Sequence, residues 1–133
     1  MADYQAPLRD MSFVLNEVFE AGKLWAQLPA LADTVDDETA AAILEEAGKV
    51  AAGSIAPTNR SGDEEGCTWT DGAVTTPKGF IEAYNTYAAG GWVGVGGDPQ
   101  FGGMGMPKMI TAQIEEMINS ANLSFGLYPM LTA

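Results

Sequence analysis

The chain has 133 residues, which fits one domain able to bury roughly two-thirds of the surface of its unfolded form. With 18 acidic and 6 basic residues, its formal net charge of −12 repels nucleic-acid backbones and anionic membrane surfaces. It contains no histidine and one cysteine, which excludes the usual zinc ligand sets, histidine-dependent triads and an internal disulfide. No nucleic-acid partner and no bound metal are therefore expected.

The chain also lacks the patterns of secreted and membrane proteins. Residues 1–11 are acidic and polar, so no secretory signal is predicted. No charge-free apolar run of about 18 residues supports a membrane span. A cytoplasmic location is the expectation.

The first half of the chain has two helical patterns. Residues 7–28 place apolar side chains on one helical face and predict a helix, a break near Gly22 and a further helical turn. A second helix is predicted after a cap at Asp33 or Thr34 and is expected to end at Pro57. Its inward side chains follow a 3.6-residue period: Ala40, Ile43, Leu44, Ala47, Val50, Ala51 and Ile55.

A long irregular loop is expected over residues 57–76. Within it, Asp71-Gly72 separates two short β-prone runs and predicts a small hairpin. Thr76 and Pro77 are read as the cap and first residue of a helix that closes at Gly90-Gly91. Its apolar stripe is Phe80, Ile81, Tyr84, Tyr87 and Ala88.

The glycine-rich stretch 90–107 raises two interpretations, a phosphate-binding loop and a loop that only turns the chain. It matches neither the dinucleotide fingerprint nor a P-loop, because Pro99 stands at the sixth position from Gly94 and no Gly-Lys-Ser/Thr ending follows. Asp98 would also repel an anion there, so the turning role is favoured.

Pro107 is predicted to start the next helix. Its inward residues are Ile110, Ile114, Met117, Ile118 and Ala121, and its outward residues are Lys108, Gln113 and Glu116. Residues 117–133 then carry no charge, but their polar and helix-breaking residues suit them poorly to a bilayer. We expect other protein to cover this segment, either later domains of a longer chain or another subunit.

Three further features are read as structural. Cys67 has no histidine partner and lies close in sequence to three carboxylates, which disfavours a nucleophilic thiolate. The acidic runs at 36–38 and 61–66 lack the spacing of a cation-binding loop. No catalytic residue and no metal ligand are assigned to this chain.

One segment resembles a known family. The run Pro99-Gln100-Phe101-Gly102-Gly103-Met104-Gly105, between two helices and before the ending 121-ANLSFGLYPMLT-132, is similar to the helix-linking segment of acyl-CoA dehydrogenases. The order of helices and the N-terminal sixty residues resemble the FadE-like branch, which includes methylmercaptopropionyl-CoA dehydrogenases. The resemblance spans essentially the whole chain.

The resemblance implies a fold, a chemistry and a set of pocket residues. It implies an all-α domain of four to five helices, with residues 1–34 as an N-terminal extension and 35–133 as the N-terminal α domain, the middle β and C-terminal α domains being absent. The parent enzyme would use FAD to dehydrogenate an acyl-CoA at its α,β carbons, pass electrons to an acceptor and form a homo-oligomer. This chain alone would bind no FAD and be inactive. Its acyl-pocket wall would be Phe125, Tyr128 and Thr132.

Alternatives stay open at this stage. The three wall residues are equally expected to do no more than pack against the absent domains. The chain as a whole also fits an acidic, non-enzymatic helical module that docks on a partner through its apolar C-terminal segment. A small apolar-ligand binder is the third interpretation.

Overall fold

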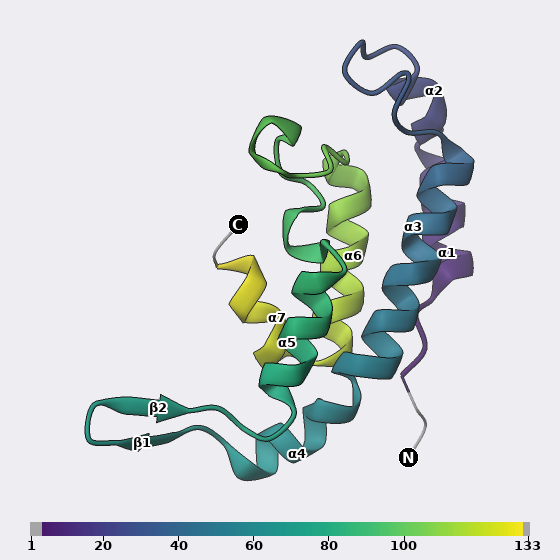
Figure 1. Ribbon diagram of the computed structural model, residues 1–133. Coiled ribbons are helices and arrows are strands. Elements are labelled where there is room, and N and C mark those ends of the chain that lie inside the picture. The colour runs from purple at the N-terminus through teal and green to yellow at the C-terminus, as the bar shows by residue number, and fades with distance from the viewer. Residues whose placement is uncertain (1–3, 132–133) are drawn as a thin grey trace.

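The computed structural model describes residues 4–131 as a bundle of helices with one protruding hairpin (Figure 1). Its α-helices and strands are α1 Leu8–Phe13, α2 Ala21–Trp25, α3 Asp37–Val50, α4 Pro57–Glu65, β1 Thr68–Thr70, β2 Ala73–Thr75, α5 Phe80–Ala89, α6 Lys108–Ala121 and α7 Leu123–Met130. Two π-helical turns, η1 Val14–Val18 and η2 Ala51–Ile55, extend α1 and α3, and two 3-10 turns, η3 Trp92–Gly94 and η4 Pro99–Phe101, lie in the glycine-rich loop. The predicted all-α class is confirmed.

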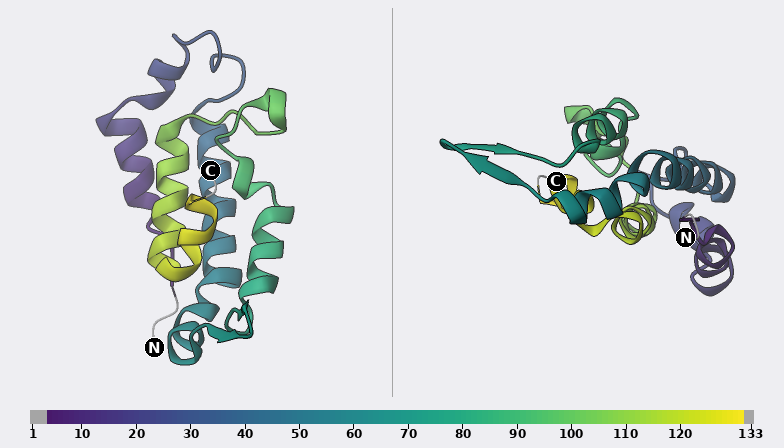
Figure 2. Two further views of the ribbon diagram at one scale, coloured as in Figure 1. Left: turned by 90° about the vertical axis from the view of Figure 1, so that its left-hand side faces the viewer. Right: turned by 90° about the horizontal axis from the view of Figure 1, so that it is seen from below.

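Helix α6 forms the centre of the bundle and contacts α3, η2 and α7 (Figures 1 and 2). The inward residues predicted for it are all buried: Ile110, Ile114, Met117, Ile118 and Ala121. The prediction that Gln113 points outward is wrong, since Gln113 is 9% exposed and its Nε2 donates to the Met11 carbonyl at 3.2 Å. A long polar side chain is thus buried where it ties α6 to α1.

The N-terminal segment has the predicted helix, break and helical turn, with the break at Glu20. Glu20 adopts a left-handed conformation with φ 46°, which separates η1 from α2. Met11 and Leu15 are buried, whereas the neighbouring apolar side chains on this segment are exposed: Phe13, Val14, Val18 and Phe19. Only one side of this helix therefore belongs to the core.

The second helix starts later and continues further than predicted. Its cap is Asp36, whose Oδ1 accepts from the Thr39 N–H at 2.7 Å, in place of Asp33 or Thr34. Pro57 does not end the helical path but begins α4. Proline suits the first helical position because its missing N–H is not needed there and its φ is already helical. The irregular loop expected from residue 57 accordingly starts only after Glu65.

The hairpin predicted at Asp71-Gly72 is confirmed. Both turn residues have positive φ, 49° and 84°, the geometry that favours a tight antiparallel turn. Trp69 pairs with Val74, and all six strand residues are exposed. The hairpin projects from the bundle on the flank that carries α7, away from α1 (Figures 1 and 2).

Helix α5 begins at Phe80, so the predicted start at Thr76 and Pro77 is wrong. Gly79 precedes the helix with φ 84°, a conformation that glycine adopts without a steric penalty. Phe80 then packs on Gly62 of α4, where an added Cβ would lie 2.5 Å from the Phe80 ring. The helix ends at Gly90-Gly91 as predicted.

The glycine-rich loop is folded back on itself. Backbone N–H groups of Met104, Gly105 and Met106 donate to the carbonyls of Gly94, Gly97 and Val95 at 2.9, 2.9 and 3.0 Å. These amides are used within the loop, so they are not directed at an anion. These hydrogen bonds within the loop favour the interpretation that residues 90–107 only turn the chain between two helices.

Candidate functional site

Helix α7 begins at Leu123, and Asn122 is its N-cap residue. The Asn122 Oδ1 accepts from the Phe125 N–H at 3.1 Å and from the Ser124 hydroxyl at 2.7 Å, which caps the helix. The Asn122 Nδ2 donates to the Thr58 Oγ1 of α4 at 2.9 Å. This side chain is 1% exposed, so one buried amide fixes both the start of α7 and its position against α4.

Four aromatic rings from α5 and α7 form a cluster at the base of the site. Phe125 lies at ring-centroid distances of 6.2 Å from Phe80, 6.0 Å from Tyr87 and 6.5 Å from Tyr128. Phe80 and Tyr128 are 6.0 Å apart in an edge-on arrangement. These tilted and edge-on geometries are the favourable ones for aromatic pairs, so the cluster holds α7 rigidly against α5.

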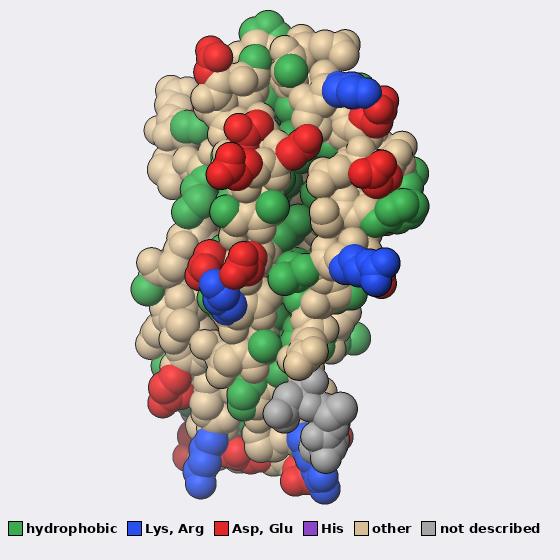
Figure 3. Space-filling model, turned by 90° about the vertical axis from the view of Figure 1, so that its right-hand side faces the viewer, with side chains coloured by type: hydrophobic (Ala, Val, Ile, Leu, Met, Phe, Trp, Pro, Cys, Tyr) green, Lys and Arg blue, Asp and Glu red, His purple; other side chains and the backbone are tan. Residues whose placement is uncertain are grey.

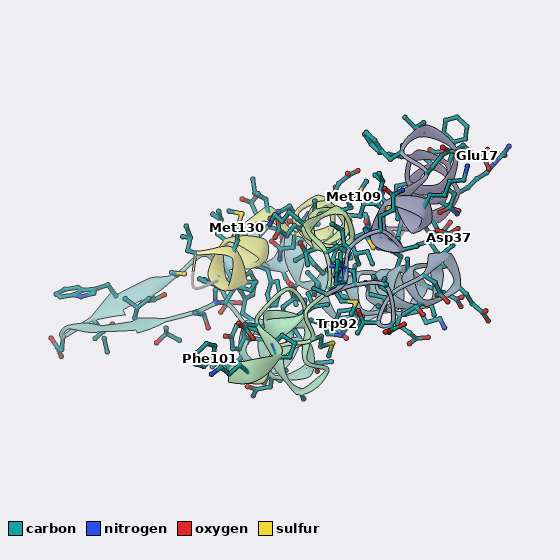
Figure 4. The ribbon with its side chains drawn as sticks, turned by 90° about the horizontal axis from the view of Figure 1, so that it is seen from above. Glu17, Asp37, Trp92, Phe101, Met109 and Met130 are labelled. Carbon is teal, nitrogen blue, oxygen red and sulfur yellow. The ribbon has the colours of Figure 1, made fainter. Side chains whose placement is uncertain are left out.

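Two hollows flank α7. The first, which we name the Tyr128 hollow, measures about 360 Å³ and is lined by Thr76, Phe80, Ile81, Tyr84, Asn85 and Tyr128. The second, the Trp92 groove, measures about 330 Å³ and lies between α5, the glycine-rich loop, α6 and the other side of α7. Figure 4 shows Trp92 and Met130, which line that groove, on facing elements.

The predicted wall residues occupy different environments. Phe125 is 0% exposed and lies in the core behind the Tyr128 hollow. Tyr128 is 39% exposed and forms part of the wall of that hollow. Thr132 lies outside the described residues. Gly126 faces α6, where an added Cβ would approach the Asn119 Oδ1 to 2.0 Å, so its closest neighbour is a helix of this chain.

Sequence reasoning missed the contribution of α5 to this site. Ile81 and Tyr84 were read as part of an inward stripe, but they are 63% and 36% exposed and line the Tyr128 hollow. The sequence does carry one signal for these exposed residues, the width of the apolar stripe on α5. A helix that is apolar over more than one face has more apolar surface than its own core can cover.

Two tyrosine hydroxyls at the site stay neutral in the physiological range. Burial, with smaller effects from Glu115 and Tyr84, raises the pKa of Tyr87 to about 12. Burial, with the neighbouring Cys67 thiol, also raises the pKa of Tyr128 above its usual value. The Tyr87 and Tyr128 hydroxyls are therefore neutral hydrogen-bonding groups at neutral pH.

The described residues offer no cluster of metal ligands and few available cations. Within residues 4–131 no group of three His, Cys, Asp or Glu side chains is placed to hold a metal ion. Four basic side chains, Lys23, Lys49, Arg60 and Lys108, are engaged in ion pairs with glutamates of the chain. The pyrophosphate of a dinucleotide would therefore meet few available cations and many carboxylates.

The sequence matches curated proteins over nearly its full length. It is 38% identical over 131 residues to the 3-methylmercaptopropionyl-CoA dehydrogenase of Ruegeria pomeroyi. It is 31% identical over 130 residues to the broad-specificity linear acyl-CoA dehydrogenase FadE5 of Mycobacterium tuberculosis, and 31% identical over 138 residues to the butyryl-CoA dehydrogenase of Syntrophomonas wolfei. These alignments cover 97%, 96% and 98% of this chain.

The chain is similar to the N-terminal region of acyl-CoA dehydrogenases. It spans only 22%, 21% and 22% of the three relatives, at their N-terminal ends. No family model matches it. The resemblance to acyl-CoA dehydrogenases of the methylmercaptopropionyl-CoA branch is thus confirmed. None of the helices in residues 4–131 is long and apolar enough to cross a membrane.

Proposed function

We propose that this chain is the N-terminal helical domain of an FAD-dependent acyl-CoA dehydrogenase, with residues 1–34 as its extension and 35–133 as the domain proper. The observation that carries the proposal is the alignment of 97% of the chain with the N-terminal fifth of a 3-methylmercaptopropionyl-CoA dehydrogenase. The reaction of the parent enzyme is α,β-dehydrogenation of an acyl-CoA thioester, for which FAD accepts the hydride. Because the described residues offer few available cations for a dinucleotide pyrophosphate, later domains would hold the FAD.

The role proposed for this chain is to supply one wall of the acyl pocket. The Tyr128 hollow is lined mostly by aromatic and aliphatic side chains, which suits an alkyl chain more than a charged group. It is open on one side, where a later domain would close it. Phe125 supports this wall from behind by holding the Phe80 and Tyr128 rings. Thr132, beyond Tyr128 along the chain, would extend the wall.

Reconstitution from two pieces tests the proposal. The Ruegeria pomeroyi relative would be expressed without its N-terminal fifth and mixed with this chain, and dehydrogenation of 3-methylmercaptopropionyl-CoA would be followed with an artificial electron acceptor. We expect turnover only when both pieces are present. Two separately folded pieces that neither associate nor turn over substrate would count against the proposal and favour the non-enzymatic interaction module.

A matched pair of variants tests the pocket role within the same assay. Tyr128→Ala should raise the KM for the acyl-CoA, because it removes wall surface from the hollow. Trp69→Ser, at a side chain that is 70% exposed on the hairpin and does not line the hollow, should leave KM unchanged. Equal KM values for the two variants would remove the Tyr128 hollow from the acyl pocket while leaving the domain assignment intact.

A further inference from the structure

One residue of the Tyr128 hollow carries a hydroxyl that has no hydrogen-bond partner. Thr76 follows β2, lines the hollow and is partly exposed, but its Oγ1 is buried. No group within residues 4–131 forms a hydrogen bond with this oxygen. Buried polar atoms nearly always have a partner in folded proteins, because an unmade hydrogen bond costs free energy. The Thr76 hydroxyl is therefore an exception that lies at the edge of a ligand-sized hollow.

Thr58 shows how a structural threonine of the same domain is treated. Its Oγ1 is buried, donates to the Ile55 carbonyl at 2.7 Å and accepts from the Asn122 Nδ2 at 2.9 Å. These two bonds hold α4 to its neighbours. The hydroxyl of Thr76 makes no such bond within the described part of the chain, so it adds no hydrogen bond to the fold and is available to a ligand.

The lining of the hollow is neutral. None of its six lining residues is Asp, Glu, Lys or Arg. Figure 3 shows charged side chains on the flank of α1 and α3, which lies across the bundle from the hairpin in Figure 1. A carboxylate or phosphate in the hollow would find no counter-charge there, and the net charge of −12 would repel it. The polar atom that pairs with Thr76 is therefore neutral.

We propose that the Tyr128 hollow binds an acyl chain that carries a neutral oxygen, and that the Thr76 hydroxyl donates a hydrogen bond to this oxygen. The inference rests on the acyl-pocket role proposed for the hollow. The hydroxyl and the methyl group of threonine share one Cβ, so a change of χ1 between staggered positions turns the hydroxyl toward the ligand.

An ether oxygen is the simplest group of this kind. It replaces a methylene at little change of chain length and adds an acceptor, which a plain alkyl chain lacks. A thioether sulfur is a weak acceptor and would gain less from Thr76. The hollow therefore distinguishes chains by one atom, whereas its apolar walls hold the rest of the chain.

Urea unfolding of the 133-residue chain tests the unpartnered hydroxyl without flavin or acyl-CoA. Thr76→Val keeps the shape of the side chain and removes the hydroxyl, so it should leave the free energy of unfolding unchanged or raise it. Thr58→Val is the matched control and should lower it, because the buried Asn122 Nδ2 loses its acceptor. A loss for Thr76→Val as large as that for Thr58→Val would overturn the proposal, since the hydroxyl would then have a partner in the fold.

The two-piece reconstitution tests the ligand. We would compare kcat/KM for heptanoyl-CoA with the values for its 5-oxa and 6-oxa isosteres, whose oxygen is not bonded to the reacting α and β carbons. The ratio of oxa to alkyl substrate should fall about fivefold in Thr76→Val for at least one isostere, the effect of one hydrogen bond. Thr76→Ser keeps the hydroxyl and should keep the ratio. Taking a ratio cancels any change in the association of the two pieces.

The outcomes separate this inference from the proposed function. Turnover of all three substrates with the same ratio in Thr76→Val would overturn the role of the hydroxyl and leave the dehydrogenase assignment intact. An equal fall of the ratio in Thr76→Ser and Thr76→Val would also overturn it, because shape and not the hydroxyl would then decide. No turnover of any acyl-CoA would overturn both.

Discussion

Replacing Asn122 by alanine is expected to destabilise the domain more than any single surface change. The substitution removes the cap of α7, which typically costs about 1 kcal/mol of unfolding free energy. It also removes the 2.9 Å hydrogen bond from the Asn122 Nδ2 to the Thr58 Oγ1, and a buried hydrogen bond contributes about 1 kcal/mol. Because Asn122 is 1% exposed, water cannot replace either interaction. We therefore expect a loss of about 2–3 kcal/mol.

Urea unfolding followed by circular dichroism measures this loss. Asn59→Ala, at an exposed position of α4, is the matched control and should change the unfolding free energy by less than about 0.5 kcal/mol. Thr58→Val removes the same hydrogen bond from the other side, so the double variant with Asn122→Ala should lose less than the sum of the single effects. If Asn122→Ala changes stability as little as Asn59→Ala, the assignment of this amide as the link between α4 and α7 is wrong.

Two further predictions concern the glycine-rich loop and the buried tyrosine. Gly103→Ala would place a Cβ 2.1 Å from the Gly97 carbonyl oxygen, so it should lower the free energy of unfolding measured in urea. Gly53→Ala is the control: its Cβ would meet nothing within 4 Å, so this variant should be neutral or stabilising. Equal effects of the two variants would refute the close approach of Gly103 to the Gly97 carbonyl. Tyr87 has its folded pKa raised to about 12, so its contribution to stability is complete below pH ~10 and is lost as pH rises towards 12. Unfolding free energy measured from pH ~9 to ~12 should fall more steeply for the original chain than for Tyr87→Phe, and parallel curves would contradict this.

Local sequence signals predicted the elements whose form depends on neighbours in the chain. The inward face of α6 follows from a 3.6-residue period that holds from Ile110 to Ala121. The hairpin follows from Asp71-Gly72, which tolerates the positive φ values that its turn requires.

The errors arose where distant segments decide the outcome. Helical structure continues beyond Pro57 because Thr58 and Gly62 pack against other helices, which the polar sequence of α4 does not reveal. Gln113 is buried because the Met11 carbonyl, 102 residues away in sequence, accepts its hydrogen bond. At the candidate site, the resemblance implied Phe125 and Tyr128 as wall residues, but only the packing against α5 determined that Phe125 is core and Tyr128 is exposed.

Flavin reduction in a chimaeric enzyme tests the central claim most directly. The chimaera would carry this chain in place of the N-terminal fifth of the Ruegeria pomeroyi relative, and 3-methylmercaptopropionyl-CoA would be added without an electron acceptor. Since the claim is that this chain completes the acyl pocket of a dehydrogenase, we predict that the visible absorbance of the bound flavin is bleached. A folded chimaera that retains flavin but shows no bleaching would contradict it.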